Sequence, residues 1–462
     1  MKISKNISVL AAAWIAAGCA STPNLPTYKA QLAADFANAS ATQAEPVAEF
    51  WRAFGDADLD ALVAQAIKAN ADLRIAGANL REARALANFA DAQSKPTIGA
   101  SADAARVRAR DSQGKSQTGN VFAAGFDVAW EADLFGRISG ERQAALAQVL
   151  ASESLVRAAQ VSVASEVARN YFELRGFQEQ LRVAKASLET QRAALKLVAA
   201  RLAVGRGTAL DTERANALVQ TTAASIPSLE TALIRTRYRI AVLSGQVPTA
   251  LDTQLANQKP LPGMKPVALN SIGSPENLLR RRPDVAAAEQ QVAAAAARIG
   301  IARSELFPRL TLGGSVGLNA GRIADLGKSA AFVYNLGASL LWTLLDFGRN
   351  RAQIAAASAR GEAAIIAYEK AVLGALEETE GALAAYSRTQ RQTESLFAAA
   401  QSASKAADIA RARFSAGTSD FLAVLDAERE LLAARDRLAQ AQTGGATSLV
   451  AVYKSLAGGW KP

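Results

Sequence analysis

The sequence predicts a mixed α+β membrane protein in which long α-helices dominate and four amphipathic strands complete the fold. The main observation is an internal duplication, because landmark residues recur 212 positions later along the chain. Asp72 is matched by Asp284 and Trp130 by Trp342. A repeat of this length predicts two substantial units related by an approximate internal symmetry. The other two observations are long heptad-patterned segments and four short segments of alternating apolar and polar residues.

The N-terminus has the pattern of a secretory signal. Lys2 and Lys5 precede an apolar stretch and then Gly18-Cys19. The run from Ala16 to Cys19 resembles a bacterial lipobox, and Cys19 is the only cysteine. We therefore expect residues 1–18 to be removed and Cys19 to carry covalent diacylglycerol and N-palmitate, with a buried structural cysteine as the alternative. Residues 19–50 contain three prolines among small and polar residues and predict an irregular tether.

Composition excludes several classes of function. The chain has no histidine and one cysteine, so the commonest general base and the usual metal ligands are missing. The formal net charge of +10 falls to +8 when the two lysines of the signal are removed, and the remaining basic residues are scattered among acids. We expect neither an enzyme, nor a metal site, nor a nucleic-acid partner, and no cofactor apart from the lipids on Cys19.

The first repeat spans residues 51–245. We predict helices over about residues 57–93, 139–203 and 209–244, and strands over about 97–110 and 121–135. The longest helix carries a leucine every seventh residue, which is typical of a packed coiled-coil seam. These leucines are Leu174, Leu181, Leu188, Leu195 and Leu202. At 1.5 Å per residue this helix is about 100 Å long, and Pro227 is expected to kink or end the shorter helix locally.

The strand segments have one apolar and one polar face. In the first repeat the apolar face carries Phe122, Ala124, Phe126, Val128, Trp130, Ala132 and Leu134. This pattern favours strands of an outer-membrane barrel, with a soluble sandwich as the alternative. Four strands cannot close a barrel, so several copies of the chain must share it. The first strand ends in Arg106, Arg108 and Arg110, which we expect either to lie beyond the bilayer or to face the lumen.

A proline-rich linker, residues 246–283, leads to the second repeat at 284–457 and a tail at 458–462. The second repeat is predicted to contain helices over about 284–305, 349–414 and 420–457, and strands over about 309–320 and 331–347. Pro283-Asp284 suits the first turn of a helix. We interpret Arg280-Arg281-Arg282 before it as a solvated helix entry rather than a phosphate site.

Two glycine turns reverse the long helical hairpins at the end opposite the strands. Glycine supports such a reversal, and Thr208 or Ser419 could cap the helix that follows. Just past the second turn, Leu422 and Asp426 are four residues apart and share one helix face.

Several sequence blocks resemble the TolC-like outer-membrane efflux proteins. These blocks are FWRAFGDADLDALV from Phe50, AWEADLFGR from Ala129, RRPDV from Arg281, LFPRLTL from Leu306, LLWTLLDFGR from Leu340 and ARFSAGTSDFLAVLDAE from Ala412. Within the family the chain is similar to the lipoprotein branch of OprM and NodT type. The resemblance implies a homotrimer in the outer membrane of a Gram-negative bacterium, with a shared twelve-stranded β-barrel and a periplasmic α-barrel.

The resemblance also implies a passive exit duct for small molecules that joins a periplasmic membrane-fusion adaptor and an inner-membrane transporter of the resistance-nodulation-division (RND) class. It places adaptor contacts at the helix-turn tips, which comprise Gly205, Arg206, Gly207, Thr208, Gly417, Thr418, Ser419 and Asp420. It places Leu422 and Asp426 at the periplasmic aperture as an apolar ring and a carboxylate ring. The alternative for Asp426 is a solvated coiled-coil face, as for Glu428 and Glu430, and the first repeat has Arg214 at the position equivalent to Asp426.

Three further carboxylates, Asp127, Glu131 and Asp133, share the polar strand face and are interpreted as channel lining rather than as catalytic groups. Two other functions remain open at this point. One is a duct for type I protein secretion, and the other is a lipid-anchored periplasmic coiled-coil tether, which the amphipathic strands disfavour.

Overall fold

The computed structural model describes residues 33–38, 49–110, 114–261 and 274–456. Within these ranges the chain is mostly helical, with one antiparallel sheet in the strand order β1-β2-β3-β4. No described helix combines the length and the apolar content needed to cross a membrane. The signal segment, Cys19 and the C-terminal tail lie outside the described residues. The chain divides into two compact units, and each contains segments of both repeats.

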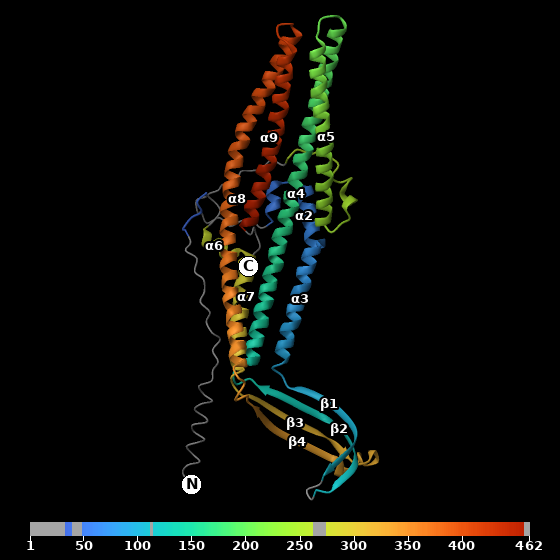
Figure 1. Ribbon diagram of the computed structural model, residues 1–462, viewed down its shortest axis with the longest axis vertical. Helices are drawn as coiled ribbons and strands as arrows, with labels where there is room; N and C mark the ends of the chain where they lie inside the picture. The colour runs from blue at the N-terminus through green and yellow to red at the C-terminus, as the bar shows by residue number, and fades with distance from the viewer. Residues whose placement is uncertain (1–32, 39–48, 111–113, 262–273, 457–462) are drawn as a thin grey trace. The chain divides into compact units, whose positions relative to one another are not determined.

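The duplication is confirmed in the backbone. Three pairs of helices begin and end 212 residues apart: α3 (Ala71–Ala92) with α7 (Pro283–Ser304), α4 (Arg137–Ala203) with α8 (Arg349–Ser415), and α5 (Ala209–Leu243) with α9 (Phe421–Ser455). Figure 1 shows each long helix turning back as a hairpin, α4 with α5 and α8 with α9.

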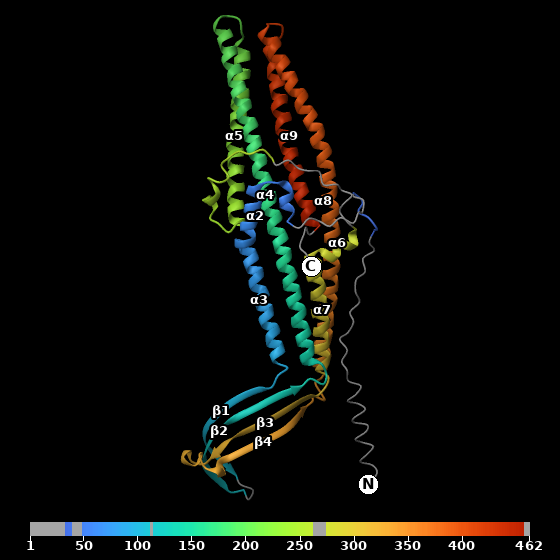
Figure 2. The ribbon, with the colours of Figure 1, turned by 180° about the vertical axis from the view of Figure 1, so that it is seen from behind.

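The first unit, residues 79–153 and 287–370, holds the sheet. Its strands are β1 (Thr97–Arg110), β2 (Ser116–Ala132), β3 (Arg309–Ala320) and β4 (Phe332–Leu341), which lie side by side in both Figure 1 and Figure 2. β2 begins at Ser116 rather than near residue 121, because its first residues pair with the end of β1 as a two-stranded ribbon. β4 ends at Leu341 rather than near residue 347, because its partner β3 starts at the residue opposite, Arg309.

The second unit, residues 30–78, 154–286 and 371–462, contains one unexpected helix break. The segment predicted as one helix over residues 57–93 forms α2 (Ala57–Ala69) and α3, separated by Asn70. Asn70 is buried and its backbone is not helical, with φ −57° and ψ 136°, and its side-chain oxygen accepts hydrogen bonds from the backbone N–H groups of Asp72 and Leu73. Its amide also donates to the carbonyl of Leu243, 2.9 Å away. The asparagine therefore caps α3 and ties this corner to the end of α5.

The main core of the second unit combines aromatic side chains with a larger number of aliphatic ones. The 3₁₀-helix η1 (Phe50–Phe54) inserts Phe50 against Tyr453, with ring centroids 5.2 Å apart, and Phe54 against Phe172 at 4.7 Å. The heptad leucines Leu174 and Leu181 are buried in the same core.

Pro227 is predicted to kink α5 or to end it locally, and the second alternative is wrong. The helix continues through this residue. Proline removes one backbone donor, but the 35-residue helix keeps its other bonds and packs against α9.

Two short helices occupy the described part of the region between the repeats. They are η2 (Pro248–Leu251) and α6 (Pro275–Arg281). The predicted solvated run Arg280-Arg281-Arg282 lies at the end of α6, and the prediction is wrong for Arg282, which is only 8% exposed. Its guanidinium donates to Asp284, to Glu378 at 2.8 Å and to the carbonyl of Ser455 at 3.0 Å. The residue joins the start of α7 to α8 and to the end of α9.

Burial and hydrogen bonding act in opposite directions on these charges. Burial lowers the pKa of Arg282, but its bonds to Asp284 and Glu378 outweigh this and raise it. Burial raises the pKa of both carboxyl groups, and the Arg282 guanidinium, with Lys454 for Glu378, holds the pKa of each below its ordinary value. Arg282, Asp284 and Glu378 are therefore charged at neutral pH.

Candidate functional site

One face of the sheet is apolar across all four strands. Residues paired in an antiparallel sheet point to the same side, and the register joins Ala100 to Phe126, Phe126 to Val316 and Val316 to Tyr334. The alternation predicted from the sequence is therefore continuous from strand to strand. In the single chain this face is uncovered, with Tyr334 78% and Leu336 85% exposed. Such a surface fits hydrocarbon rather than water.

The opposite face is polar. Asp127 pairs with Ser315, and Ser315 with Asn335. The Asp127 carboxylate lies over the neighbouring strand, where a side-chain carbon added at Gly99 would be 2.8 Å from one of its oxygens. Asp127 thus occupies the face expected to line the channel.

Glu131 and Asp133, the other two carboxylates predicted on this face, make hydrogen bonds where the sheet joins α4. Glu131 accepts two hydrogen bonds from Arg137, at 2.9 and 2.8 Å. Asp133 lies beyond the end of β2 and accepts from the backbone N–H groups of Ile138 and Ser139, so it caps α4. The expectation that Asp133 lines the channel as a strand residue is therefore wrong.

Two tryptophans mark the end of the sheet to which the helices attach. The indole of Trp130 donates to the carbonyl of Ser94 at 2.9 Å, and that of Trp342 donates to the carbonyl of Leu306 at 3.1 Å. Donors and acceptors are both 212 residues apart, so the repeat extends to individual hydrogen bonds. Aromatic residues that keep one polar contact at the rim of an apolar face are typical of a membrane interface.

The outer strands β1 and β4 each pair on one side only within the described residues. Unpaired backbone groups at a sheet edge are not tolerated in hydrocarbon. A sheet with this apolar face therefore needs further strands from other copies of the chain.

Both helical tips, in the second unit, have the same glycine-centred turn. Gly205 and Gly417 adopt positive φ angles of 72° and 74°. At the first tip the N–H of Gly205 donates to Leu202 and that of Arg206 to Arg201, and the second tip repeats both bonds. This pattern is the Schellman motif, which satisfies the last carbonyls of a helix.

The caps after the turns agree with the prediction in one repeat only. Thr208 caps α5 by accepting from the backbone N–H of Asp211 at 3.1 Å. In the second repeat Asp420 caps α9 by accepting from Ala423, also at 3.1 Å. The prediction that Ser419 caps the second helix is therefore wrong. Its hydroxyl is buried without a hydrogen-bond partner, and the internal repeat itself places residue 420 opposite Thr208.

An apolar cluster joins the two tips. It consists of Val198, Ala215, Leu218, Phe414, Phe421, Val424 and Leu425. The guanidinium of Arg201 lies over the Phe414 ring, 4.1 Å from its centroid, and Arg201 also donates to the Phe414 carbonyl at 3.3 Å. This cation–π contact fastens the first hairpin to the second.

Leu422 and Asp426 both lie outside this cluster. Leu422 is 38% exposed and Asp426 is exposed on the same side of α9. The solvated position expected for Glu428 is wrong, because Glu428 is buried and its carboxylate is 2.6 Å from the Arg411 guanidinium. Burial raises the pKa of Glu428 although Arg411 opposes this effect.

The described residues contain no cluster of three or more histidine, cysteine, aspartate or glutamate side chains that could hold a metal ion. The arrangement is a membrane sheet with a polar inner face, together with long helical hairpins that end in matched tips.

Comparison with known proteins identifies this arrangement. The sequence profile of the family described as "Outer membrane efflux protein" matches residues 62–246 and 274–458. The chain belongs to the outer membrane efflux protein family. It is 33% identical over 469 residues to the pyoverdine export outer membrane protein OpmQ of Pseudomonas aeruginosa. The aligned residues cover 99% of this chain and 97% of OpmQ. It is 31% identical to the outer membrane protein OprJ of the same species, over 98% of this chain and 96% of OprJ.

Solved structures give the same result. The outer-membrane channel OprN superposes with a TM-score of 0.90 at 37% identity, covering 96% of this chain and 100% of OprN. The open state of the Neisseria gonorrhoeae MtrE channel gives 0.82 at 27% identity, with 96% and 99% covered. The predicted fold class is thereby confirmed, as are the outer-membrane location and the role as an exit duct for efflux.

The internal symmetry of the efflux protein predicts where a further copy packs. In the first unit α4 contacts α7, because a carbon added at Gly140 would lie 2.9 Å from Ile301. The equivalent pair, 212 residues away, is Ala352 of α8 and Phe89 of α3. Both residues are exposed in the single chain, and Phe89 is 63% exposed.

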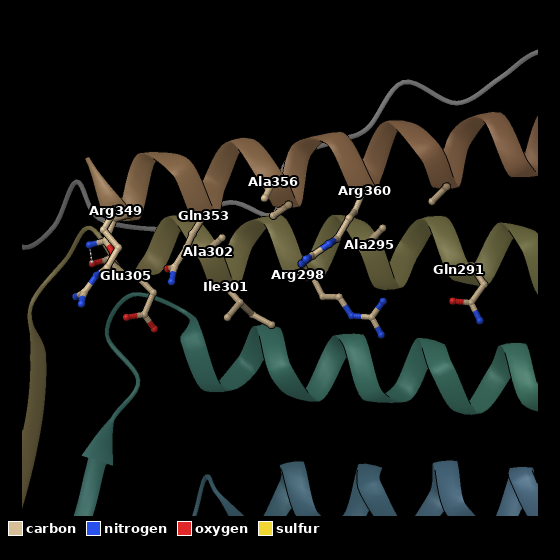
Figure 3. Close-up of a pocket in the computed structure, with 13 residues that line it drawn as sticks. Gln291, Ala295, Arg298, Ile301, Ala302, Glu305, Arg349, Gln353, Ala356 and Arg360 are labelled. Atoms are coloured by element: carbon tan, nitrogen blue, oxygen red, sulfur yellow. Dashed lines mark hydrogen bonds between the residues drawn. The ribbon is translucent and has the colours of Figure 1, made fainter. Parts of the chain in front are cut away.

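The first unit also has a groove between α7 and α8. Its volume is about 840 Å³, and Figure 3 shows α7 and α8 side by side along it. Arg298 of α7 and Arg349 and Arg360 of α8 supply most of its charge, with alanines between them. The groove is partly open to solvent rather than fully enclosed.

Sequence reasoning missed the charged residues that are buried, namely Arg282, Glu428 and also Arg175. Arg175 is almost fully buried, where it contacts Asp58 at 3.2 Å and Tyr171 at 2.9 Å. For Arg282 the sequence did contain a signal of an ion pair, since this arginine directly precedes the Pro283-Asp284 helix start. For the other two residues the charged partners, Asp58 for Arg175 and Arg411 for Glu428, come from other helices, which one sequence does not reveal.

Proposed function

We propose that three copies of this efflux protein form a passive duct that exports small organic molecules, delivered by a periplasmic membrane-fusion adaptor and an inner-membrane RND transporter. The names of the similar proteins support this cargo class. OpmQ is a pyoverdine export protein, and two other relatives at 31% identity serve solvent and toluene efflux pumps. The cation efflux protein CusC is less similar, at 27% identity.

The observation that supports assembly with a periplasmic adaptor is the pair of matched hairpin tips. Both tips expose short polar turns beyond a shared apolar cluster, so a helical partner can approach them without displacing core residues. We assign the adaptor contact to residues 205–208 and 417–420. Substitution of Arg206 and Thr418 by glutamate should weaken adaptor capture in pull-down assays while leaving the trimer intact. Unchanged capture would remove the tips from the adaptor interface.

The narrowest opening is assigned to Leu422 and Asp426. Three copies of an exposed carboxylate that face one another would repel and would attract cations. Asp426→Ala should therefore raise single-channel conductance or reduce its dependence on cations in planar bilayers. Glu213→Ala, which removes an exposed carboxylate from α5, is the matched control. Identical traces for Asp426→Ala and the unaltered protein would exclude Asp426 from the aperture.

The lipid anchor is assigned to Cys19, which lies outside the described residues. Cys19→Ser should abolish incorporation of labelled palmitate, and unchanged labelling would reject the anchor.

The cargo is tested by complementation of an efflux-deficient strain. The protein should restore resistance to organic solvents and dyes when it is expressed with its adaptor and transporter. Secretion of a protein substrate with an ATP-driven exporter, in place of restored resistance, would favour type I secretion and overturn the proposal.

A further inference from the structure

The ribbon formed by β1 and β2 carries three arginines on the apolar side of the sheet. The register continues without interruption from Ala104 opposite Phe122 to Arg106 opposite Asn120 and Arg108 opposite Thr118. Because paired residues share a side, the arginines follow the apolar residues of β1 on the same face. This excludes the lumen-facing alternative. All three, Arg106, Arg108 and Arg110, are exposed.

These arginines have no carboxylate partner in the described part of the chain. Their cross-strand neighbours on this face are Asn120, Thr118 and Ser116, which are uncharged hydrogen-bonding residues. The alternation of the strand places the acid of β1, Asp103, on the opposite face, and Asp111, which follows Arg110, lies outside the described residues. The face therefore offers three guanidinium groups with amide and hydroxyl groups beside them.

Their position along the strand corresponds to the outer headgroup layer. The apolar face of β2 from Trp130 to Phe122 is about 26 Å long, or about 20 Å of membrane height with the usual strand tilt, which approaches the apolar band of such barrels. The arginines occupy about the next 13 Å of β1. They lie toward the hairpin end of the sheet, opposite the end that joins the helices, and so on the extracellular side of this outer-membrane protein.

We propose that Arg106, Arg108 and Arg110 bind the phosphate groups of the phosphorylated glycolipid, lipid A, in the outer leaflet. Guanidinium groups bind phosphate in bidentate fashion, and the adjacent apolar face accommodates the acyl chains of the same lipid. The strand order makes a neighbouring copy of β4 the next element beyond β1, and the β4 segment FVYNLGASLL contains no acidic residue.

The remaining acid of the second hairpin is already engaged. Asp325 accepts from Arg322 at 3.0 Å and from Lys328 at 2.6 Å. A lipid phosphate is thus the anion that both the position and the chemistry of the arginine face fit.

The test uses the full-length trimer, delipidated in detergent and titrated with diphosphoryl lipid A in native mass spectrometry. The triple variant Arg106→Gln, Arg108→Gln, Arg110→Gln should bind lipid A on the order of a hundredfold more weakly, at about fivefold for each arginine. Fully dephosphorylated lipid A should bind the unaltered protein and the triple variant equally. Inorganic phosphate in excess should not displace lipid A, because it lacks acyl chains.

The matched control removes three exposed arginines from helices, as Arg74→Gln, Arg81→Gln, Arg235→Gln, and should leave lipid A binding unchanged. Equal binding by the unaltered protein and the triple variant would overturn the proposal. So would an equal loss in the control, or displacement by inorganic phosphate alone. If the triple variant does not form an SDS-resistant trimer, Arg108→Gln alone replaces it, with an expected fivefold loss.

Discussion

The exposed ring of Phe89 gives a quantitative test of how copies of the chain assemble. Inside one chain, α4 and α7 meet at Gly140 and Ile301. The duplication predicts the same contact between α8 of one copy and α3 of the next, with Phe89 against Ala352. Phe89 and Ala352 are both exposed within one chain. We therefore expect this second contact to form between neighbouring chains and to close the ring.

The size of the effect follows from the exposed area of this ring. A large aromatic side chain has about 200 Å² of surface, and 63% of the Phe89 surface is uncovered in the single chain. Covering about 130 Å² stabilises each interface by about 3 kcal/mol at 25 cal/mol per Å². Phe89→Ala should therefore weaken a trimer with three such interfaces by roughly 9 kcal/mol in total. The adjoining exposed residue supplies the control, Asn88→Ala, which should change trimer stability little.

The assay is disulfide trapping in a Cys19→Ser background. Phe89→Cys with Ala352→Cys should yield crosslinked dimers and trimers on non-reducing gels. The equivalent pair Gly140→Cys with Ile301→Cys should form a bond within one chain and leave only monomer bands. If the first pair stays monomeric under conditions that oxidise the second, α3 does not meet α8 of the next copy and the symmetry reasoning fails.

Two further predictions concern stability. Arg282→Met leaves Asp284 without its cation and Glu378 with Lys454 alone, and should cost about 2–3 kcal/mol at neutral pH, since both carboxylates are partly exposed. The native pKa values of Asp284 and Glu378 are lowered, so their contribution is present above the ordinary carboxyl pKa and is lost as pH falls below it. Thermal melts followed by circular dichroism should show the difference shrinking below about pH 4.5, and a constant difference would contradict the ion-pair explanation. Gly176→Ala places a carbon 2.1 Å from the Thr443 hydroxyl and should destabilise the contact of α4 with α9 by about 1–3 kcal/mol. Adding Thr443→Ala should restore most of the melting temperature, and no rescue would mean that the clash lies elsewhere.

The features that sequence predicted well are those with a period. Strand alternation and the leucine heptads depend on neighbouring residues, although the last of these leucines, Leu202, is exposed. The predicted ends of two helix pairs, α4 with α8 and α5 with α9, agree with the structure to within two residues. The failures involve partners distant in sequence. Asn70 interrupts a continuous helical pattern because its side chain bonds to Leu243, and Glu428 is buried because Arg411 of the preceding helix neutralises it.

The two helical hairpins carry opposite charges at equivalent positions near their tips. Leu210 and Leu422 are 212 residues apart and both exposed, yet the residues four positions later are Arg214 and Asp426. If the two hairpins were equivalent at the aperture, three arginines would alternate with three aspartates and largely neutralise them. A cation-attracting ring therefore requires the second hairpin to approach the axis more closely than the first. In bilayer recordings Arg214→Ala should then leave cation preference nearly unchanged, whereas Asp426→Ala should reduce it. A marked rise in cation preference for Arg214→Ala would instead show that both hairpins line the opening and that the aperture carries an alternating ring.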